Sequence, residues 1–257
     1  MKRIFISFAV AALVLASYHT GIFFGSRTIY VYDETVFQSS GPVVFRPYSN
    51  LSNIPNASSA SIVVPAVDSS GKGVATNLTV QAIPGYGKAL VNIDRMLFWV
   101  DTQSSIRTAR SVAEQTLGIN TSEYDLVFTI EANATVIEGP SAGAALTAAT
   151  IAALSNRTVN NTVMMTGTIN PDGTIGPVGE ILAKAGAAKD IGAEAFLVPV
   201  SQSVVTTYEQ VRHCEKVGWT EVCTTETVPK KVNVAIETGI KTIEVANIRE
   251  AISYVFI

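Results

Sequence analysis

The chain is poor in histidine and cysteine. Its 257 residues include two histidines, His19 and His213, and two cysteines, Cys214 and Cys223. A zinc-type site needs three or four such ligands, so we expect no metal site of that kind. A catalytic serine activated by histidine would also have only these two histidines to choose from. The scarcity therefore directs attention to other side chains that can accept a proton.

Charge is scarce as well. Charged residues make up 15% of the chain and hydrophobic residues 47%, and the mean hydropathy is +0.32. Disordered chains have the opposite composition, so the sequence predicts a folded core. The net charge is −3, from 18 basic and 21 acidic residues. Because nucleic-acid binding requires a concentrated basic surface, we expect no nucleic-acid partner.

The N-terminus is the longest apolar run. Lys2 and Arg3 precede Ile4–Gly25, 22 residues without a formal charge. Its first part is typical of a secretory signal, with Val14-Leu15-Ala16 as a cleavage site, and the whole run is long enough for a membrane-spanning helix. A buried core helix is a third interpretation. We predict that residues 1–25 are a signal peptide or membrane anchor and that the following chain is extracytoplasmic.

Two further patterns agree with export. Seven N-x-S/T sequons occur, which predicts glycosylation where the organism has that machinery; they begin at Asn50, Asn56, Asn77, Asn120, Asn133, Asn156 and Asn160. In an oxidising compartment we expect Cys214 and Cys223 to close a small hairpin with a disulfide. A nucleophilic pair of His213 with Cys214 is the alternative.

After a predicted linker at residues 26–56, residues 57–257 show the signals of one mixed α/β domain. Strands are expected at 61–67, 75–83, 89–93, 126–131, 162–168 and 195–200, with one more around 28–32 in the linker. Helices are expected at 102–117, 141–154, 179–191 and 248–254. The polar segment 201–233 looks like an insertion before the last strand and helix.

Ser141 lies where a loop opens an uncharged, Ala-rich helix, in Glu138-Gly139-Pro140-Ser141-Ala142-Gly143. Backbone N–H groups at a helix start favour negative charge, and a serine nucleophile needs such donors for the oxyanion it generates. The small neighbours leave space for a substrate backbone. An ordinary N-capping serine is the alternative interpretation.

Lys184 is a candidate proton acceptor. At 100° per residue it falls between Ala188 and Ile191 on the apolar side of the predicted helix. Burial disfavours the charged form of lysine, which lowers its pKa and allows it to act as a base. A surface pair of Glu180 with Lys184 is the alternative interpretation.

These motifs together resemble one family. The block around Ser141, then Met165-Thr166-Gly167, then the run from Gly173 to Lys184 is similar to the proteolytic domain of Lon proteases, and the interval of 43 residues between serine and lysine also matches. The resemblance spans roughly residues 60–257. It implies an α+β fold, a single proteolytic domain with mixed sheets and packed helices, and a serine peptidase without a cofactor.

The resemblance also implies roles for individual residues. Ser141 would be the nucleophile and Lys184 its general base. Thr166 would help to orient the lysine amine, and Glu138, which stands where the family often has aspartate, would support the site. Gly139, Ala142 and Gly143 would provide backbone for the oxyanion or the substrate.

One departure from the family concerns ATP. The sequence has no G-x-x-x-x-G-K-[ST] loop, so we expect a stand-alone, ATP-independent endopeptidase that cuts unfolded chains or flexible segments. Polypeptides would be its partners, the membrane would be contacted through an uncleaved N-terminus, and a homo-oligomer is compatible with the family. A non-catalytic interaction module and a factor that processes only itself or one partner are the alternatives.

Overall fold

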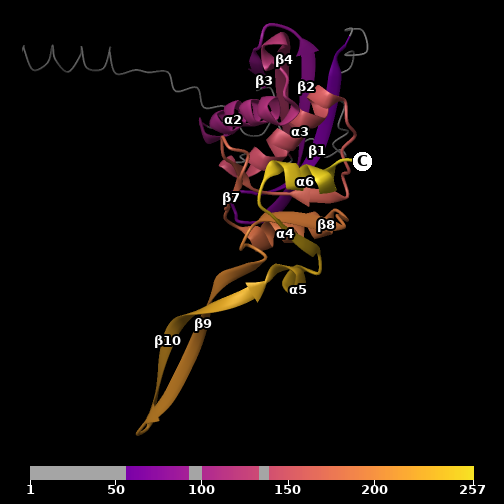
Figure 1. Cartoon of the computed structure of the whole chain (residues 1–257). Helices are drawn as coiled ribbons and strands as arrows, with labels where there is room; N and C mark the ends of the chain where they lie inside the picture. The colour runs from indigo at the N-terminus through magenta and orange to yellow at the C-terminus, as the bar shows by residue number, and fades with distance from the viewer. Residues whose placement is uncertain (1–55, 93–99, 133–138) are drawn as a thin grey trace, which may run out of the picture. The chain divides into compact units, whose positions relative to one another are not determined.

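The computed structural model of the chain describes residues 56–92, 100–132 and 139–257 (Figure 1). The predicted signal or anchor at 1–25 and the predicted linker, apart from its last residue, lie outside these ranges. So do Glu138, Asn50 and Asn133. Within the described ranges, no helix combines the length and the apolar character needed to cross a bilayer.

The first sheet has four strands. They are β1 (Ser58–Val67), β2 (Gly73–Pro84), β3 (Ala89–Val91) and β4 (Tyr124–Ala132), in the order β1-β2-β4-β3. Neighbours are antiparallel except β3, which runs parallel to β4. Alternate side chains such as Ile62, Leu78 and Phe128 are fully buried, as expected for a sheet with one face on the core.

Two helices cover that core. α2 (Val100–Leu117) packs against α3 (Gly143–Ser155), and α3 also packs on β1 and β2. Every residue of 143–153 is buried. The helix can be buried because its hydroxyls find partners within it: Thr147 and Thr150 donate to the carbonyls four residues earlier, at 2.8 and 2.7 Å.

A second, parallel sheet follows. β5 (Val163–Met165), β8 (Ala195–Pro199) and β11 (Lys241–Val245) are ordered β11-β8-β5, and β6 (Thr168–Ile169) pairs with β7 (Ile175–Gly176). The remaining helices are α4 (Ile181–Asp190), α5 (Val234–Thr238) and α6 (Ile248–Val255). The described residues form a mixed α+β architecture with several sheets, as the sequence predicts.

Several predicted bounds differ from the structure by a few residues, and three of the differences bear on the candidate site. The strand predicted at 162–168 ends at Met165, because the next two residues turn toward Ser141. The helix predicted from Ser141 starts at Gly143, after a 3-10 turn. The helix predicted to include Ile191 ends at Asp190, and Ile191 is 49% exposed instead of lying on the buried side.

The polar segment 201–233 forms a long antiparallel hairpin. β9 (Val204–Val217) pairs with β10 (Thr220–Asn233) along their full lengths. Most of its side chains are exposed, including Trp219 at the turn. Figure 1 shows the hairpin leaving the domain beside α5.

Gly73, at the start of β2, touches α4 one residue before Lys184. A Cβ at Gly73 would lie 2.1 Å from the carbonyl oxygen of Ala183, whereas a Cβ at Gly186 of the same helix would meet nothing within 4 Å. We predict that Gly73→Ala lowers the free energy of unfolding by about 1–3 kcal/mol through overpacking.

Gly186→Ala is the matched control and should raise the free energy of unfolding by about 0.5–1 kcal/mol, since alanine favours helix. Urea unfolding followed by circular dichroism measures both. Equal effects of the two substitutions would show that β2 does not press against α4.

Candidate functional site

Ser141 lies in a 3-10 turn, Pro140–Ala142, that leads directly into α3. Gly139 precedes the turn with φ 97°, a conformation that glycine adopts without the strain other residues carry. Pro140 occupies the first position of the turn, where its missing N–H costs nothing. The local sequence therefore fixes Ser141 at the end of a sharp bend.

Hydrogen bonds hold the serine turn against the residues that follow β5. The carbonyl of Ser141 accepts from the N–H of Gly167 at 2.9 Å and from the hydroxyl of Thr166 at 3.3 Å. The N–H of Ala144 donates to the carbonyl of Gly167 at 3.0 Å. Thr166 is fully buried, and its N–H donates to Leu197 of β8. Thr166 thus connects the serine turn to the second sheet.

Lys184 is buried in α4, as its position on the apolar side predicts, with only 5% of its surface exposed. Its Nζ donates to the carbonyl of Gly179 at 3.0 Å. Burial lowers the pKa of Lys184 from its ordinary value of 10.5 to about 8, because desolvation destabilises the ammonium. Attraction to the carboxylate of Glu180 offsets part of this effect.

A cavity of about 340 Å³ joins the two residues. Ser141 and Lys184 both line it, together with Gly139 of the predicted set. Its other walls are the end of β1, Thr168 of β6 and the loop before α4, with the lining residues Ala66, Val67, Pro140, Thr168, Pro177, Val178, Gly179 and Glu180. The fold therefore brings together a hydroxyl and a partly deprotonated amine that are 43 residues apart.

Gln202 holds the loop that carries Gly179. Its side-chain carbonyl accepts from the N–H of Val178 at 3.0 Å, and its amide donates to the carbonyl of Val178 at 2.7 Å. The two bonds fix Val178 as a neighbouring strand would. Glu180, at the end of the loop, has a positive φ of 56°. Gln202, which lies just before β9, thus fixes the loop whose Gly179 carbonyl accepts from Lys184.

Of the predicted residues that the structure describes, Ala142, Gly143 and Thr166 do not line the cavity. Ala142 is half-buried against the core. Gly143 is buried, its N–H donates to Pro140, and a Cβ there would be 2.9 Å from the backbone nitrogen of Ile169. Packing alone thus explains why this residue is glycine. The proposed roles of these two residues, and that of Thr166 toward the lysine, stay predictions.

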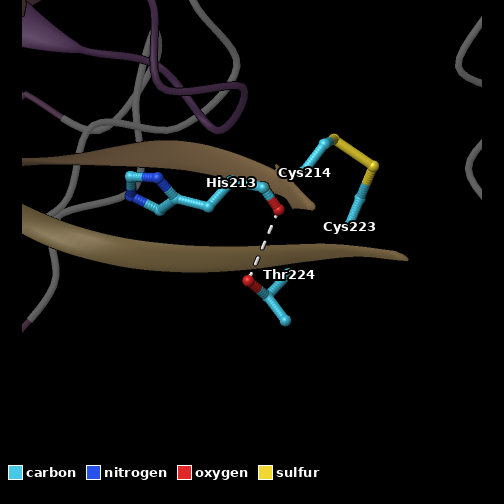
Figure 2. Close-up of a disulfide and its surroundings, with 4 residues drawn as sticks. All are labelled: His213, Cys214, Cys223 and Thr224. Atoms are coloured by element: carbon cyan, nitrogen blue, oxygen red, sulfur yellow. Dashed lines mark hydrogen bonds between the residues drawn. A yellow bond between two sulfur atoms is a disulfide. The ribbon is translucent and has the colours of Figure 1, made fainter. Parts of the chain in front are cut away.

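Cys214 and Cys223 form a disulfide across the hairpin, with Cα atoms 4.0 Å apart. Figure 2 shows the His213 imidazole pointing away from the sulfur atoms, while the carbonyl of His213 accepts from the hydroxyl of Thr224 at 3.5 Å. A nucleophilic pair of His213 with Cys214 is therefore wrong in this state. Glu221 lies close to both cysteines, but sulfurs bonded to each other are not available as thiolate ligands.

Sequence reasoning missed Gly179 and Gln202 as parts of the site. A carbonyl partner for a lysine leaves no mark in the sequence, because any residue type supplies it. Gln202 lies 24 residues from Val178 and within a segment that looks like a polar insertion. Only the glycine-rich run before the helix indicated that a tight loop precedes Lys184.

Comparisons with a protein family and with individual proteins both find similarity to Lon proteases. Residues 99–215 match the family described as Lon protease (S16) C-terminal proteolytic domain. The chain is 36% identical over 85 residues to Lon protease 2 of Bacillus subtilis, covering 33% of this chain and 15% of that protein. It is 40% identical over 100 residues to Lon protease of Phenylobacterium zucineum, covering 38% and 12%.

A third relative, Lon protease of Desulfovibrio desulfuricans, is 37% identical over 128 residues, which cover 48% of this chain and 14% of that protein. In these three alignments the chain thus spans only 12% to 15% of its relatives' length. The alignments test similarity of the domain and leave the roles of Ser141 and Lys184 as predictions.

The burial of Lys184 has a consequence for stability. Its pKa is about 8 in the folded chain against 10.5 ordinarily, so between these pH values the unfolded chain binds more protons. The free energy of unfolding should therefore rise with pH across that window, by on the order of 1 kcal/mol or more. We predict that Lys184→Met is more stable than wild type at pH 7 and that this advantage shrinks toward pH 10.5.

Lys189→Met is the control, because Lys189 is exposed on the same helix. Denaturant unfolding at several pH values measures the difference of each variant from wild type. A difference for Lys184→Met that is independent of pH would contradict a lysine of lowered pKa.

Proposed function

We propose that this chain is a serine endopeptidase in which Ser141 and Lys184 form the catalytic dyad, because residues 99–215 match the proteolytic domain of Lon proteases. The observation that carries the proposal is that Ser141 and Lys184 both line one cavity and that the lysine is buried. The two histidines are not needed.

In this mechanism the Oγ of Ser141 attacks the carbonyl carbon of the scissile bond. Neutral Lys184 accepts the hydroxyl proton and then passes it to the leaving amine, which breaks the C–N bond and leaves an acyl-serine. Water hydrolyses the ester with the same lysine as base. Backbone N–H groups beside Ser141 would stabilise the oxyanion.

Gly179 has a positioning role in this mechanism. Its carbonyl accepts a hydrogen bond from Nζ and so fixes where the amine lies. Burial supplies the neutral form, since at a pKa of about 8 a fraction of the lysine is deprotonated near neutral pH. Thr166 supports the serine turn through the Ser141 carbonyl.

We further propose that hydrolysis requires no ATP and acts on unfolded chains or flexible segments. The chemistry of a serine and a lysine uses no nucleotide, and the sequence contains no Walker-type phosphate loop. A folded substrate does not present an extended backbone to a cavity of this size, whereas an unfolded one does.

We predict that Ser141→Ala and Lys184→Met each lower the rate of casein cleavage about 10⁴-fold, because the dyad acts as a unit. Fluorescein release from labelled casein, without ATP, measures the rate. In wild type the rate should rise with pH around pH 8 as Lys184 loses its proton.

Lys189→Met is again the control and should cleave at the wild-type rate. Undiminished cleavage by folded Ser141→Ala and Lys184→Met proteins would refute the dyad. If the wild type cleaves no mixture of denatured proteins but cleaves itself, self-processing is favoured; if it labels with no serine-directed probe, a binding module is favoured.

We also propose that the chain is extracytoplasmic and that residues 1–25 direct it there as a signal or an anchor. Charge at Lys2 and Arg3 before the apolar run supports this orientation. The disulfide supports an oxidising compartment.

Expression of the full chain with fractionation and intact-mass spectrometry tests the location. We predict either a mature N-terminus near residue 17 in an exported fraction or the intact chain in the membrane fraction. Intact chain with reduced cysteines in the cytosolic fraction would contradict export.

A further inference from the structure

A second cavity lies beside the one that holds Ser141 and Lys184. Its volume is about 420 Å³, and it is open to the surface. Its walls come from the loop before α4, the first turns of α4 and the root of the hairpin: Val178, Glu180, Ile181, Leu182, Ser201, Gln202, Val204, Val205, Thr206 and Thr207. Val178 and Glu180 line both cavities, so the loop that carries Gly179 is a wall of each.

The second cavity follows the edge of β9. It is lined by four consecutive residues, Val204–Thr207. Side chains alternate between the faces of a strand, so a cavity above one face would meet only every second residue. Contact with four in succession places the cavity along the backbone of the strand.

That edge has no strand partner in the part of the chain that the structure describes. β9 and β10 form a two-stranded sheet, so β9 is paired on one side only. Along its other side, alternate N–H and C=O groups face outward. Such an edge binds an extended polypeptide by the same hydrogen bonds that pair two strands.

Hydrogen bonds anchor the root of the hairpin, residues 201–203, to the rest of the domain. Gln202 is bonded twice to Val178, and the N–H of Ser203 donates to a carboxylate oxygen of Glu244 at 2.9 Å. The side-chain and backbone hydrogen bonds from Ser203 lower the pKa of Glu244. The N–H of Val234 donates to the carbonyl of Ser203. A pre-ordered edge loses little entropy when a peptide binds.

We propose that the free edge of β9 at Val204–Thr207, with the cavity beside it, binds an extended segment of the polypeptide substrate on one side of the scissile bond. This rests on the proposed peptidase function for the identity of the ligand. The walls that the two cavities share at Val178 and Glu180 favour substrate over a second copy of the chain, because a segment that leaves the dyad has only this loop to pass before it reaches the second cavity.

Recognition of this kind depends little on substrate sequence. The edge supplies backbone donors and acceptors, while Leu182, Val204 and Val205 supply apolar surface for alternate side chains. A folded protein has few unpaired extended segments, so the edge selects unfolded chains. The hairpin thus provides a selection for unfolded substrate that requires no motor.

The test compares two peptides that share one cleavage site, identified by mass spectrometry of digested casein. A tetrapeptide occupies the dyad cavity alone, and a dodecapeptide extends along the hairpin root. In Thr206→Trp the indole fills the second cavity. We expect this variant to lower kcat/KM for the dodecapeptide by a factor of about ten or more, which corresponds to the loss of one or two net hydrogen bonds. The kcat/KM for the tetrapeptide should stay at the wild-type value.

Thr225→Trp is the matched control, because Thr225 is an exposed threonine on the same face of the hairpin that lines neither cavity. It should cleave both peptides like wild type. Equal losses on both peptides in Thr206→Trp, or no loss on either, would overturn the proposal. So would a dimer in wild type that Thr206→Trp dissociates without affecting dodecapeptide cleavage.

A second measurement uses wild type alone. N-methylation of the dodecapeptide removes one backbone N–H at a time, and edge pairing predicts that alternate positions lower kcat/KM. A uniform or absent effect contradicts it.

The binding site and the peptidase function can fail separately. If wild type cleaves no peptide, the peptidase function fails. Binding of labelled casein to Ser141→Ala protein, measured by fluorescence anisotropy, then tests the β9 edge by itself. Weaker binding when Thr206→Trp is added, but not when Thr225→Trp is added, supports the proposed binding site. Equal binding by the two double variants overturns it.

Discussion

The burial of Lys184 is the constraint on which the site depends. A lysine at 5% exposure loses the hydration of its ammonium, and the single carbonyl of Gly179 replaces only part of it. The pKa of about 8 follows from that imbalance. The surrounding structure has to tolerate this cost: the alanines of α4 pack closely, Gly73 allows β2 to touch the helix, and Gln202 fixes the loop before it. Three separate parts of the fold thus contribute to the environment of the Lys184 amine.

The serine half of the site depends on different physics. α3 is buried along nearly its whole length and needs no charged residue, so its start can be placed deep in the domain. The turn before it is fixed by Thr166 and Gly167, which leave the second sheet to bond the Ser141 carbonyl. Because the strand ends at Met165, the next two residues are free to turn and bond the carbonyl of Ser141 beside the cavity.

Much of the domain could be predicted from sequence, because alternating apolar residues set β1, β2 and β4 and the uncharged run sets α3. The buried position of Lys184 was also predictable from helical spacing. The sequence predicts a small hairpin at the two cysteines but not its extension over residues 204–233, although valines at 205, 211, 217, 222, 228 and 232 recur among polar residues. Gln202 and the second cavity depend on contacts between distant segments, which no local pattern records.

A direct measurement of the Lys184 pKa tests the account most closely. Lysines labelled with ¹³C at Cε can be followed by NMR through a pH titration of the full chain, with the Lys184 signal assigned by its loss in Lys184→Met. A buried Lys184 that acts as the base should give a signal that titrates near pH 8, below the ordinary lysine pKa of 10.5. A Lys184 signal that titrates near 10.5 would contradict a buried lysine that acts as the base.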